Sequence, residues 1–329
     1  MIRANRTEIG SEGTASGTGL VTAHAPTTTR TGRERPEGTV KSGERIRALY
    51  ELTKPGITRH ILVTTAAGFY MASTPGGLDL VLLLHMMIGA ALASSGTLGL
   101  NQYVERDIDA LMARTAGRPI PSGRVSAQTA LVFATTTAVA GIAYQGLLVN
   151  WTTALITAAT LISYIFIYTP LKRRTSLNTL VGAVPGALPI LAGWTATGRD
   201  PDLGGWILFA IMFLWQIPHF LALAWLYRED YRDGGFVMLS AVDPDGRRTS
   251  RQIVNYAAIL LPVSLLPTAL GMAGYIYFSA ALILGLAFLL VALKTLTNNE
   301  DSWARRLFIT SVIYLPILLL LLVIDKVRI

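Results

Sequence analysis

The sequence predicts an all-α membrane protein with about nine transmembrane helices that form a bundle. Of its 329 residues 52% are hydrophobic and only 15% are charged, whereas a soluble domain usually carries roughly 25% charged residues. The apolar residues lie in long runs of about the length that crosses a bilayer, ~20 residues. Several runs are separated by only a few residues, so neighbouring helices are expected to be antiparallel.

The composition also excludes several kinds of chemistry. The chain has no cysteine, which rules out disulfides, thiolate catalysis and cysteine-ligated metal clusters. Its formal net charge is +8, but positive charge beside apolar segments usually sets membrane topology. We therefore do not expect a nucleic acid partner.

The N-terminal segment differs from the rest of the chain. Residues 1–45 are rich in threonine, glycine, serine, arginine and glutamate and lack the apolar content that folding requires. We expect them to be a disordered polar tail, and we expect residues 46–329 to form the transmembrane domain. No apolar stretch follows a short basic region within the first ~30 residues, so no cleavable signal peptide is predicted.

The first five expected spans follow one another with short polar joins. Residues 60–77 form the first apolar run, and residues 79–100 form a second run that leads into an acidic segment. Residues 127–147 and 151–170 are joined so closely that they must be neighbours. Residues 177–197 follow three adjacent cations and complete this group.

Four further spans are expected in the second half. Residues 204–226 are apolar but contain Pro218, which is expected to kink the helix and free a backbone carbonyl. Residues 253–273 and 275–293 are joined by a single residue, and residues 307–325 form the last span. Each run approaches the length that a bilayer requires.

The positive charges predict the orientation. If the N-terminus is cytoplasmic, 25 of the 28 lysine and arginine residues lie in the tail or in cytoplasmic loops. The other side holds only Arg199, Lys326 and Arg328. Because cytoplasmic loops carry the excess of lysine and arginine, we expect a protein of the cytoplasmic (bacterial inner) membrane with its C-terminus on the opposite side.

An acidic cluster follows the second expected span. Asn101, Glu105 and Asp109 are spaced four residues apart, so on a helix they share one face, whereas Asp107 points elsewhere. Oxygen ligands of this kind suit Mg²⁺, which is bound by a few carboxylates together with water and substrate phosphates. The alternative is a solvated helix end with an ion pair to Arg106.

Basic residues next to this cluster predict a diphosphate site. Arg114 and Arg118 follow it in sequence, Lys172 and Arg173 lie at the end of the fourth expected span, and Lys54 precedes the first. Arginine is the preferred bidentate partner of phosphate. Each cation alone is explained as a topological anchor, but together with the acids they favour a magnesium–diphosphate site.

A second acidic cluster follows the sixth expected span. Glu229, Asp230 and Asp233 form it, and Asp230 is the best candidate for a catalytic carboxylate there. Within the span, His219 follows Pro218. Ionisable residues in a membrane are costly and mark functional sites, so His219 is either a ligand-binding residue or an interhelical hydrogen-bonding residue.

At this point the motifs identify a family. The pattern Asn101-x-x-x-Glu105-x-x-x-Asp109, followed by Arg114-Thr-x-x-Arg118-Pro, resembles the UbiA-type intramembrane prenyltransferases. The segments Leu52-Thr-Lys-Pro-Gly, Tyr168-Thr-Pro-Leu-Lys-Arg, Trp215-Gln-Ile-Pro-His-Phe and Arg228-Glu-Asp-Tyr are similar to the branch that prenylates heme. The resemblance covers roughly residues 45–325.

The resemblance implies a nine-helix bundle with a central cavity that opens to lipid. It implies farnesyl diphosphate as the donor, protoheme IX as the acceptor and heme O as the product, with Mg²⁺ as the cofactor. Asn101, Glu105 and Asp109 match the motif that would hold Mg²⁺ and diphosphate. Arg118, Lys172 and Arg173 match family cations near the diphosphate, and His219 is a candidate heme-binding residue. Heme A synthase or oxidase assembly proteins are the partners that such a product suggests.

Two positions depart from the wider family pattern. The middle acid of the first motif is Glu105, where aspartate is usual, and its longer side chain shifts the bound ion without removing its role. In the second motif paired aspartates are usual, but here Tyr227 and Tyr231 flank Asp230. This departure puts a second magnesium site in doubt.

Three alternatives to heme farnesylation remain open at the sequence level. One is a prenyltransferase of the same family that acts on a quinone precursor or a chlorophyll-like ring. A second is a secondary transporter, but transporter sites lie near the bilayer midplane, whereas both acidic clusters here lie at one surface. The third is a structural assembly factor, which does not need acids at four-residue spacing.

Overall fold

The computed structural model describes residues 42–74, 76–297 and 300–327, and every named element in these ranges is a helix. The predicted disordered tail, residues 1–45, lies outside the described residues except for its last four, which begin the first helix. The helices are α1 (Ser42–Leu52), α2 (Pro55–Ala72), α3 (Leu80–Asp109), α4 (Ala127–Leu148), α5 (Trp151–Ile162), the π-helix η2 (Ser163–Tyr168), α6 (Thr169–Leu171), α7 (Asn178–Ala196), α8 (Leu203–Leu226), α9 (Arg228–Asp233), α10 (Leu239–Val242), α11 (Arg247–Ala269), α12 (Tyr275–Lys294) and α13 (Asp301–Ile324).

The helices confirm the predicted class of fold. In the described part of the chain, eight helices are long and apolar enough to cross a membrane. They coincide with the second to ninth expected spans, and the 18-residue helix α2 coincides with the first. The clearest difference is α3, which has 30 residues and extends to Asp109. The acidic cluster that was expected to follow the second span is therefore part of the same helix.

Local chemistry sets where several helices begin. The side chains of Asp79, Ser126, Asn150 and Asp202 each accept a hydrogen bond from a backbone N–H in the first turn of α3, α4, α5 and α8. Such caps satisfy donors that have no partner within the helix. These four residues therefore set where the helices begin after short joins.

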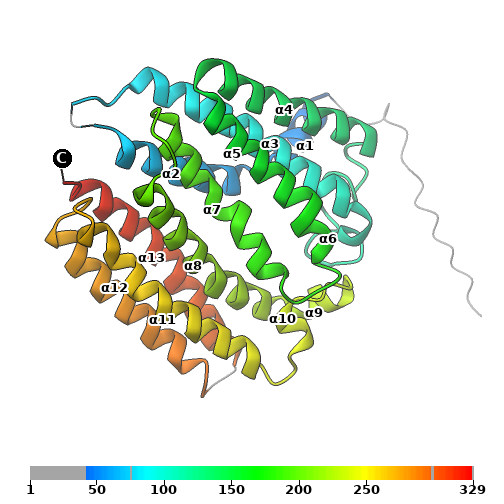
Figure 1. Ribbon diagram of the computed structural model, residues 1–329. Coiled ribbons are helices and arrows are strands. Elements are labelled where there is room, and N and C mark those ends of the chain that lie inside the picture. Colours follow the sequence, from blue (N-terminus) through cyan, green and yellow to red (C-terminus); the bar gives the residue numbers. More distant parts are fainter. Residues whose placement is uncertain (1–41, 75, 298–299, 328–329) are drawn as a thin grey trace, which may run out of the picture. The chain divides into compact units, whose positions relative to one another are not determined.

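The bundle consists of two groups of helices that meet at α7 and α8. Helices α11, α12 and α13 pack together with α8, whereas α2, α3 and α5 contact α7 and α4 packs on α3 and α5 (Figure 1). Small residues bring the backbones together: a Cβ atom on Gly96 of α3 would lie 2.3 Å from the backbone nitrogen of Ala138 in α4. Helix pairs in membranes use small residues in this way because lipid offers no hydrophobic drive for association.

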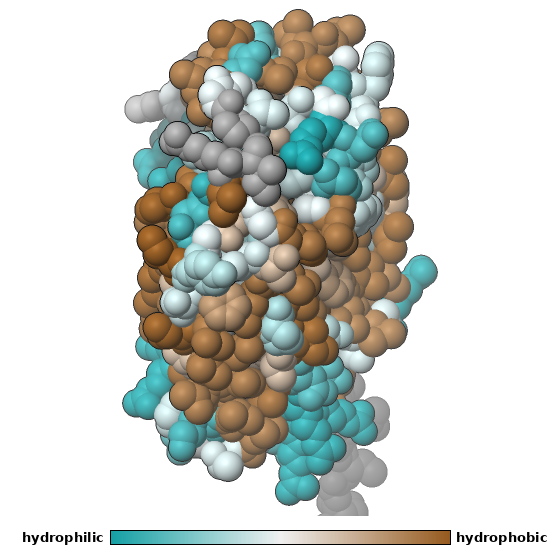
Figure 2. All heavy atoms as spheres, turned by 60° about the vertical axis from the view of Figure 1, so that its left-hand side comes forward, coloured by the Kyte–Doolittle hydropathy of each residue, from teal (hydrophilic) through white to brown (hydrophobic). Residues whose placement is uncertain are grey.

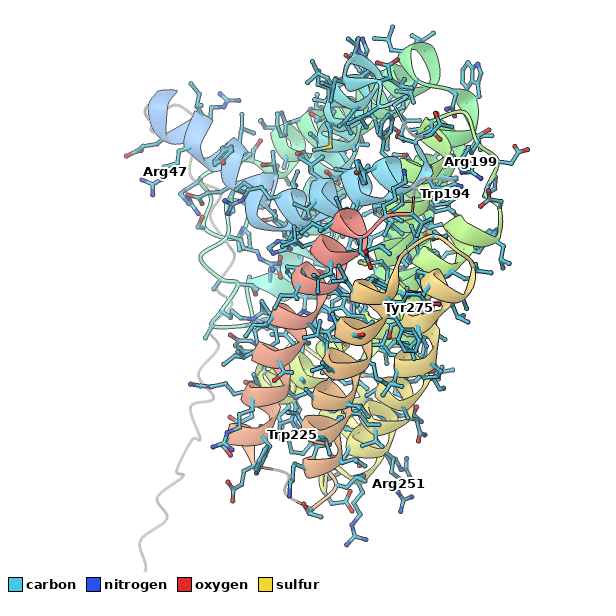
Figure 3. All side chains as sticks on the ribbon, turned by 90° about the vertical axis from the view of Figure 1, so that its left-hand side faces the viewer. Arg47, Trp194, Arg199, Trp225, Arg251 and Tyr275 are labelled. Atoms are coloured by element: carbon cyan, nitrogen blue, oxygen red, sulfur yellow. The ribbon has the colours of Figure 1, made fainter. Side chains whose placement is uncertain are left out.

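Apolar side chains also cover much of the outer surface. Leu155, Ile283 and Leu290 are exposed on α5 and α12. On the face in Figure 2 apolar side chains cover most of the middle, while hydrophilic ones gather toward the top and the bottom. In water such a surface would promote aggregation, but in a bilayer it faces lipid. Trp194 and Arg199 lie at one end of the bundle and Trp225 and Arg251 at the other (Figure 3).

Candidate functional site

The polar residues at the C-terminal end of α3 form one buried ridge. Asn101, Glu105 and Asp109 have side chains on the same face of the helix, and their residues are 1%, 5% and 1% exposed. Asp107 lies on the opposite side, where its side chain is 85% exposed and pairs with Arg106. The four-residue spacing thus separates buried from solvated acids as expected.

Glu105 is paired with Lys172. The Lys172 Nζ donates to Glu105 Oε1 at 2.7 Å, and both side chains are largely buried. The ammonium also lies 4.8 Å from the ring centroid of Tyr168 and 5.8 Å from that of Phe236. Aromatic faces attract cations, so the Lys172 ammonium is held between a carboxylate and two rings.

Asp109 is paired with Arg118. The Arg118 guanidinium donates to Asp109 Oδ2 at 2.5 Å, and the Thr115 hydroxyl donates to the Asp109 backbone carbonyl. The second carboxylate oxygen, Oδ1, is buried and has no hydrogen-bond partner among the described residues. Buried carboxylate oxygens without a partner are costly, so this atom is available for a further ligand.

Lys54 completes the cluster from the join between α1 and α2. Its Nζ donates to Asn101 Oδ1 at 3.2 Å, and the Asn101 amide donates to the Thr169 hydroxyl at 3.3 Å. Burial and the neighbouring cation Arg118 together lower the pKa of Lys54 to about 7, although Glu105 acts in the opposite direction. Lys54 has a φ angle of 47°, an uncommon conformation outside glycine, and this conformation accompanies the approach of its side chain to Asn101.

The second acidic cluster contacts the loop that follows the ridge through Arg114. The Arg114 Nε lies 3.9 Å from Asp230 Oδ2. Its guanidinium lies 4.9 Å from the ring centroid of Tyr227 and 5.7 Å from that of Tyr231. The two tyrosines that replace the usual aspartates therefore contact the arginine of the first loop.

Two other predicted site residues lie apart from this cluster. Arg173 is exposed, and its side chain forms no ion pair or hydrogen bond with the described residues. His219 lies between α8 and α13, where Nδ1 is 2.8 Å from the Ser311 hydroxyl. Its ring stacks on Trp215 and Phe308, each with a centroid distance of 4.9 Å.

The donor atoms of the ridge suit a magnesium ion. The described residues contain no group of three or more histidine, aspartate or glutamate side chains placed to hold a metal, and the ridge offers two carboxylates and one amide. Such a partial set fits Mg²⁺, which keeps waters and substrate oxygens among its ligands. The buried, unpartnered Oδ1 of Asp109 supports this fit.

The charges around the ridge suit an anionic ligand. Arg118 and Lys172 pair with the carboxylates of Asp109 and Glu105, and Lys54 bonds to the Asn101 amide, so the cluster holds three cations and two anions. A bound Mg²⁺ would add to this excess of positive charge. A diphosphate would balance it, because the cations can turn from the carboxylates to the phosphate oxygens.

Several residues of the site were not predicted from the sequence. Thr169 and Phe236 contact Asn101 and Lys172, respectively, although neither was singled out as a site residue. The segment Ser163–Tyr168 is a π-helix, a feature that is frequent at functional sites. Sequence periodicity does not reveal a π-helix, because the segment reads as a continuous apolar helix.

Comparison with known proteins agrees with the family that the sequence motifs indicate. A family model described as the UbiA prenyltransferase family matches residues 61–314. Protoheme IX farnesyltransferase from Solibacter usitatus is 47% identical over 85% of this chain and 99% of its own length. The protein of the same name from Koribacter versatilis is 42% identical over 85% of this chain and 94% of its own length.

Solved structures share the fold at low sequence identity. A digeranylgeranylglyceryl phosphate synthase superposes with a TM-score of 0.73 at 17% identity, covering 86% of this chain and 98% of that protein. A UbiA homologue from Archaeoglobus fulgidus, bound to GPP and Mg²⁺, superposes with a TM-score of 0.61 at 15% identity, covering 85% and 99%. These structures support the arrangement of helices.

Proposed function

The chain belongs to the UbiA prenyltransferase family, and on this premise we propose that it transfers a farnesyl group from farnesyl diphosphate to a vinyl group of protoheme IX. Water adds in the same reaction, and the products are heme O and diphosphate. The chain is an integral membrane prenyltransferase. We also propose the bacterial inner membrane as its location, with the N-terminus in the cytoplasm, because 25 of its 28 lysine and arginine residues then lie on that side.

The observation that carries the proposal is the buried cluster of three cations and three oxygen-bearing side chains. Lys54, Arg118 and Lys172 each bond to one member of the ridge. Asn101, Glu105 and Asp109 would hold Mg²⁺, which when bound supplies positive charge to a leaving diphosphate. We propose Asp230 and Arg114 as a second pair that contacts the diphosphate, and exposed Arg173 as an outer cation that attracts it.

The residues of the site promote departure of diphosphate by stabilising its charge. The C1–O bond of farnesyl diphosphate breaks, and its electron pair leaves with the diphosphate. Lys54, Arg118 and Lys172 donate hydrogen bonds to the phosphate oxygens as this charge develops, an electrostatic effect that is large at a site shielded from water. Tyr168 presents its ring next to Lys172 and is placed to contact the positive charge on the allyl group.

The acceptor completes the reaction with a balanced exchange of bonds. The π electrons of the heme vinyl group form a bond to C1 of the farnesyl group. The resulting carbocation takes up water and loses a proton, which leaves a hydroxyl group on the new side chain. The apolar walls of the bundle exclude water until this step, and the cavity that would hold both substrates remains a prediction.

His219 is our candidate for a contact with the heme iron. The Ser311 hydroxyl donates to the Phe308 carbonyl at 2.6 Å, so it accepts a hydrogen bond from His219 Nδ1. The network therefore places the proton on Nδ1 and the lone pair on Nε2, as in metal-binding histidines whose other nitrogen is hydrogen-bonded. Trp215 and Phe308 hold the plane of the ring on both sides.

The function is tested by mass spectrometry of hemes extracted from membranes that contain the protein, protoheme IX and farnesyl diphosphate. Wild-type protein should yield heme O, and a Glu105→Ala/Asp109→Ala double variant should lose at least ~10²-fold of the rate. Asp107→Ala is the matched control, because Asp107 lies on the same helix but its side chain is 85% exposed. A prenylated quinone precursor instead of heme O would redirect the assignment within the family, and normal rates in the double variant would refute the site.

The role of His219 needs a separate measurement. His219→Ala should shift the absorption band of bound heme and raise the KM for protoheme IX ~10-fold. The KM for farnesyl diphosphate should change less than about twofold, because His219 contacts none of the diphosphate cluster. An unchanged heme spectrum together with unchanged turnover would leave His219 as an interhelical hydrogen-bonding residue.

A further inference from the structure

A buried amide at the start of α7 connects two loops that contribute to the site. The Asn178 residue is 0% exposed. Its Nδ2 donates to the Thr175 carbonyl at 2.7 Å and to the Val237 carbonyl at 3.0 Å. The first acceptor belongs to the turn that carries Lys172, and the second belongs to the segment between α9 and α10.

The connection continues through Val237 to Lys172. The Val237 backbone N–H donates to the Lys172 carbonyl at 2.7 Å, so both backbone polar groups of Val237 contribute to the link. The preceding residue, Phe236, is 5% exposed and places its ring 5.8 Å from the Lys172 Nζ. One amide side chain therefore fixes the backbone that carries Lys172 and the segment that covers its ammonium.

The usual role of asparagine at a helix start does not explain this geometry. An asparagine that caps a helix accepts a hydrogen bond from a backbone N–H of the first turn. Asn178 instead donates both hydrogens of its amide to carbonyls outside α7, and its Oδ1 accepts from the Thr179 hydroxyl at 3.3 Å. The amide joins two loops and does not cap its own helix.

We infer that Asn178 is a positioning residue that holds Lys172 in the diphosphate site. It acts through its hydrogen bond to the Val237 carbonyl and the hydrogen bond from the Val237 N–H to the Lys172 carbonyl. The inference rests on the proposed function for the identity of the ligand, but the link itself concerns any diphosphate bound at Lys172. Lys172 is the only residue of the link that bonds directly to the ridge. Loss of Asn178 should therefore weaken diphosphate binding mainly through Lys172.

A double-mutant cycle tests this dependence. Binding of inorganic pyrophosphate in the presence of Mg²⁺ is measured by calorimetry for wild type, Asn178→Ala, Lys172→Met and the double variant. Asn178→Ala should weaken binding ~10-fold in the wild-type background and less than about twofold in the Lys172→Met background. Turnover should show the same pattern in the KM for farnesyl diphosphate, with the KM for protoheme IX unchanged.

Gln145→Ala is the matched control, because Gln145 is also a buried amide at 0% exposure but lies between α4 and α3. Its effect should be small and should multiply with that of Lys172→Met. If Asn178→Ala does not fold, Asn178→Asp retains the shape of the side chain and exchanges the amide donor for an oxygen. If the effects of Asn178→Ala and Lys172→Met on pyrophosphate binding are independent and multiply, the inference is wrong. If the wild type makes no heme O but the two substitutions still show coupled effects on binding, only the proposed function is refuted.

Discussion

At the scale of single residues, the site contains three cations that are placed to bind an anion. Each of Lys54, Arg118 and Lys172 bonds to a buried oxygen of α3. Ion pairs in low dielectric are stable only with good geometry and further hydrogen bonds. Here the pairs reduce the repulsion among the cations before substrate arrives, and they leave Asp109 Oδ1 without a partner among the described residues.

The low pKa of Lys54 predicts a pH dependence of anion binding. With a pKa of about 7, the Lys54 side chain is mostly protonated below neutral pH and becomes a neutral amine as the pH rises. Bound pyrophosphate favours the protonated form, so its affinity should fall roughly tenfold between pH 7 and pH 9 through this group. Calorimetry in the presence of a chelator measures this, because the pKa belongs to the metal-free protein.

The Lys54→Arg variant separates this effect from the titration of pyrophosphate itself. A guanidinium keeps its proton throughout this range, so the variant should show a smaller loss of affinity between pH 7 and pH 9. Equal pH profiles for the two proteins would show that Lys54 does not contribute to anion binding by its charge.

At the scale of helices, close contact between α3 and α4 places the ridge. A Cβ on Gly96 would meet the backbone of Ala138 at 2.3 Å, so Gly96→Ala must push the helices apart or distort them. We expect a loss of at least ~2 kcal/mol of stability, measured by unfolding in detergent. Gly43→Ala in α1 is the control, since no heavy atom lies within 4 Å of the added Cβ, and an equal loss there would contradict the packing argument.

The helices could be predicted from the sequence because each apolar run is about as long as a helix that crosses a bilayer. The spacing of Asn101, Glu105 and Asp109 likewise predicted one face of a helix, since helical geometry is local. The contacts of Thr169, Phe236 and Asn178 could not be predicted, because they join residues more than 50 positions apart. Nor does the sequence show which cation pairs with which acid, or that Arg173 is exposed while the Lys172 side chain is largely covered.

At the scale of the whole molecule, the site lies where the two motif-bearing loops approach each other at one end of the bundle. Arg114 from the segment after α3 contacts Asp230, Tyr227 and Tyr231 from the segment after α8. Both segments follow helices whose C-terminal ends point the same way. The charge of the loops therefore serves two purposes, because lysine and arginine that orient the chain in the membrane also surround the proposed diphosphate.

This dual use makes the membrane orientation a test of the function. Farnesyl diphosphate is too polar to cross a bilayer unaided, so the site must face the compartment that supplies it. The prediction is a cytoplasmic Asp107 and an Asp200 on the opposite side, both of which are exposed. The chain has no cysteine, so single substitutions Asp107→Cys and Asp200→Cys can each be labelled without background.

A maleimide that does not cross membranes should label Asp200→Cys in intact spheroplasts and label Asp107→Cys only after the membrane is opened. The physical reason is the strong bias of 25 among 28 cations toward one side, which fixes the direction of insertion. Labelling after permeabilisation serves as the control for the reactivity of each thiol. The reverse pattern would put the buried cluster of Lys54, Arg118 and Lys172 on the side without prenyl diphosphate, and the proposed reaction would then lack its donor.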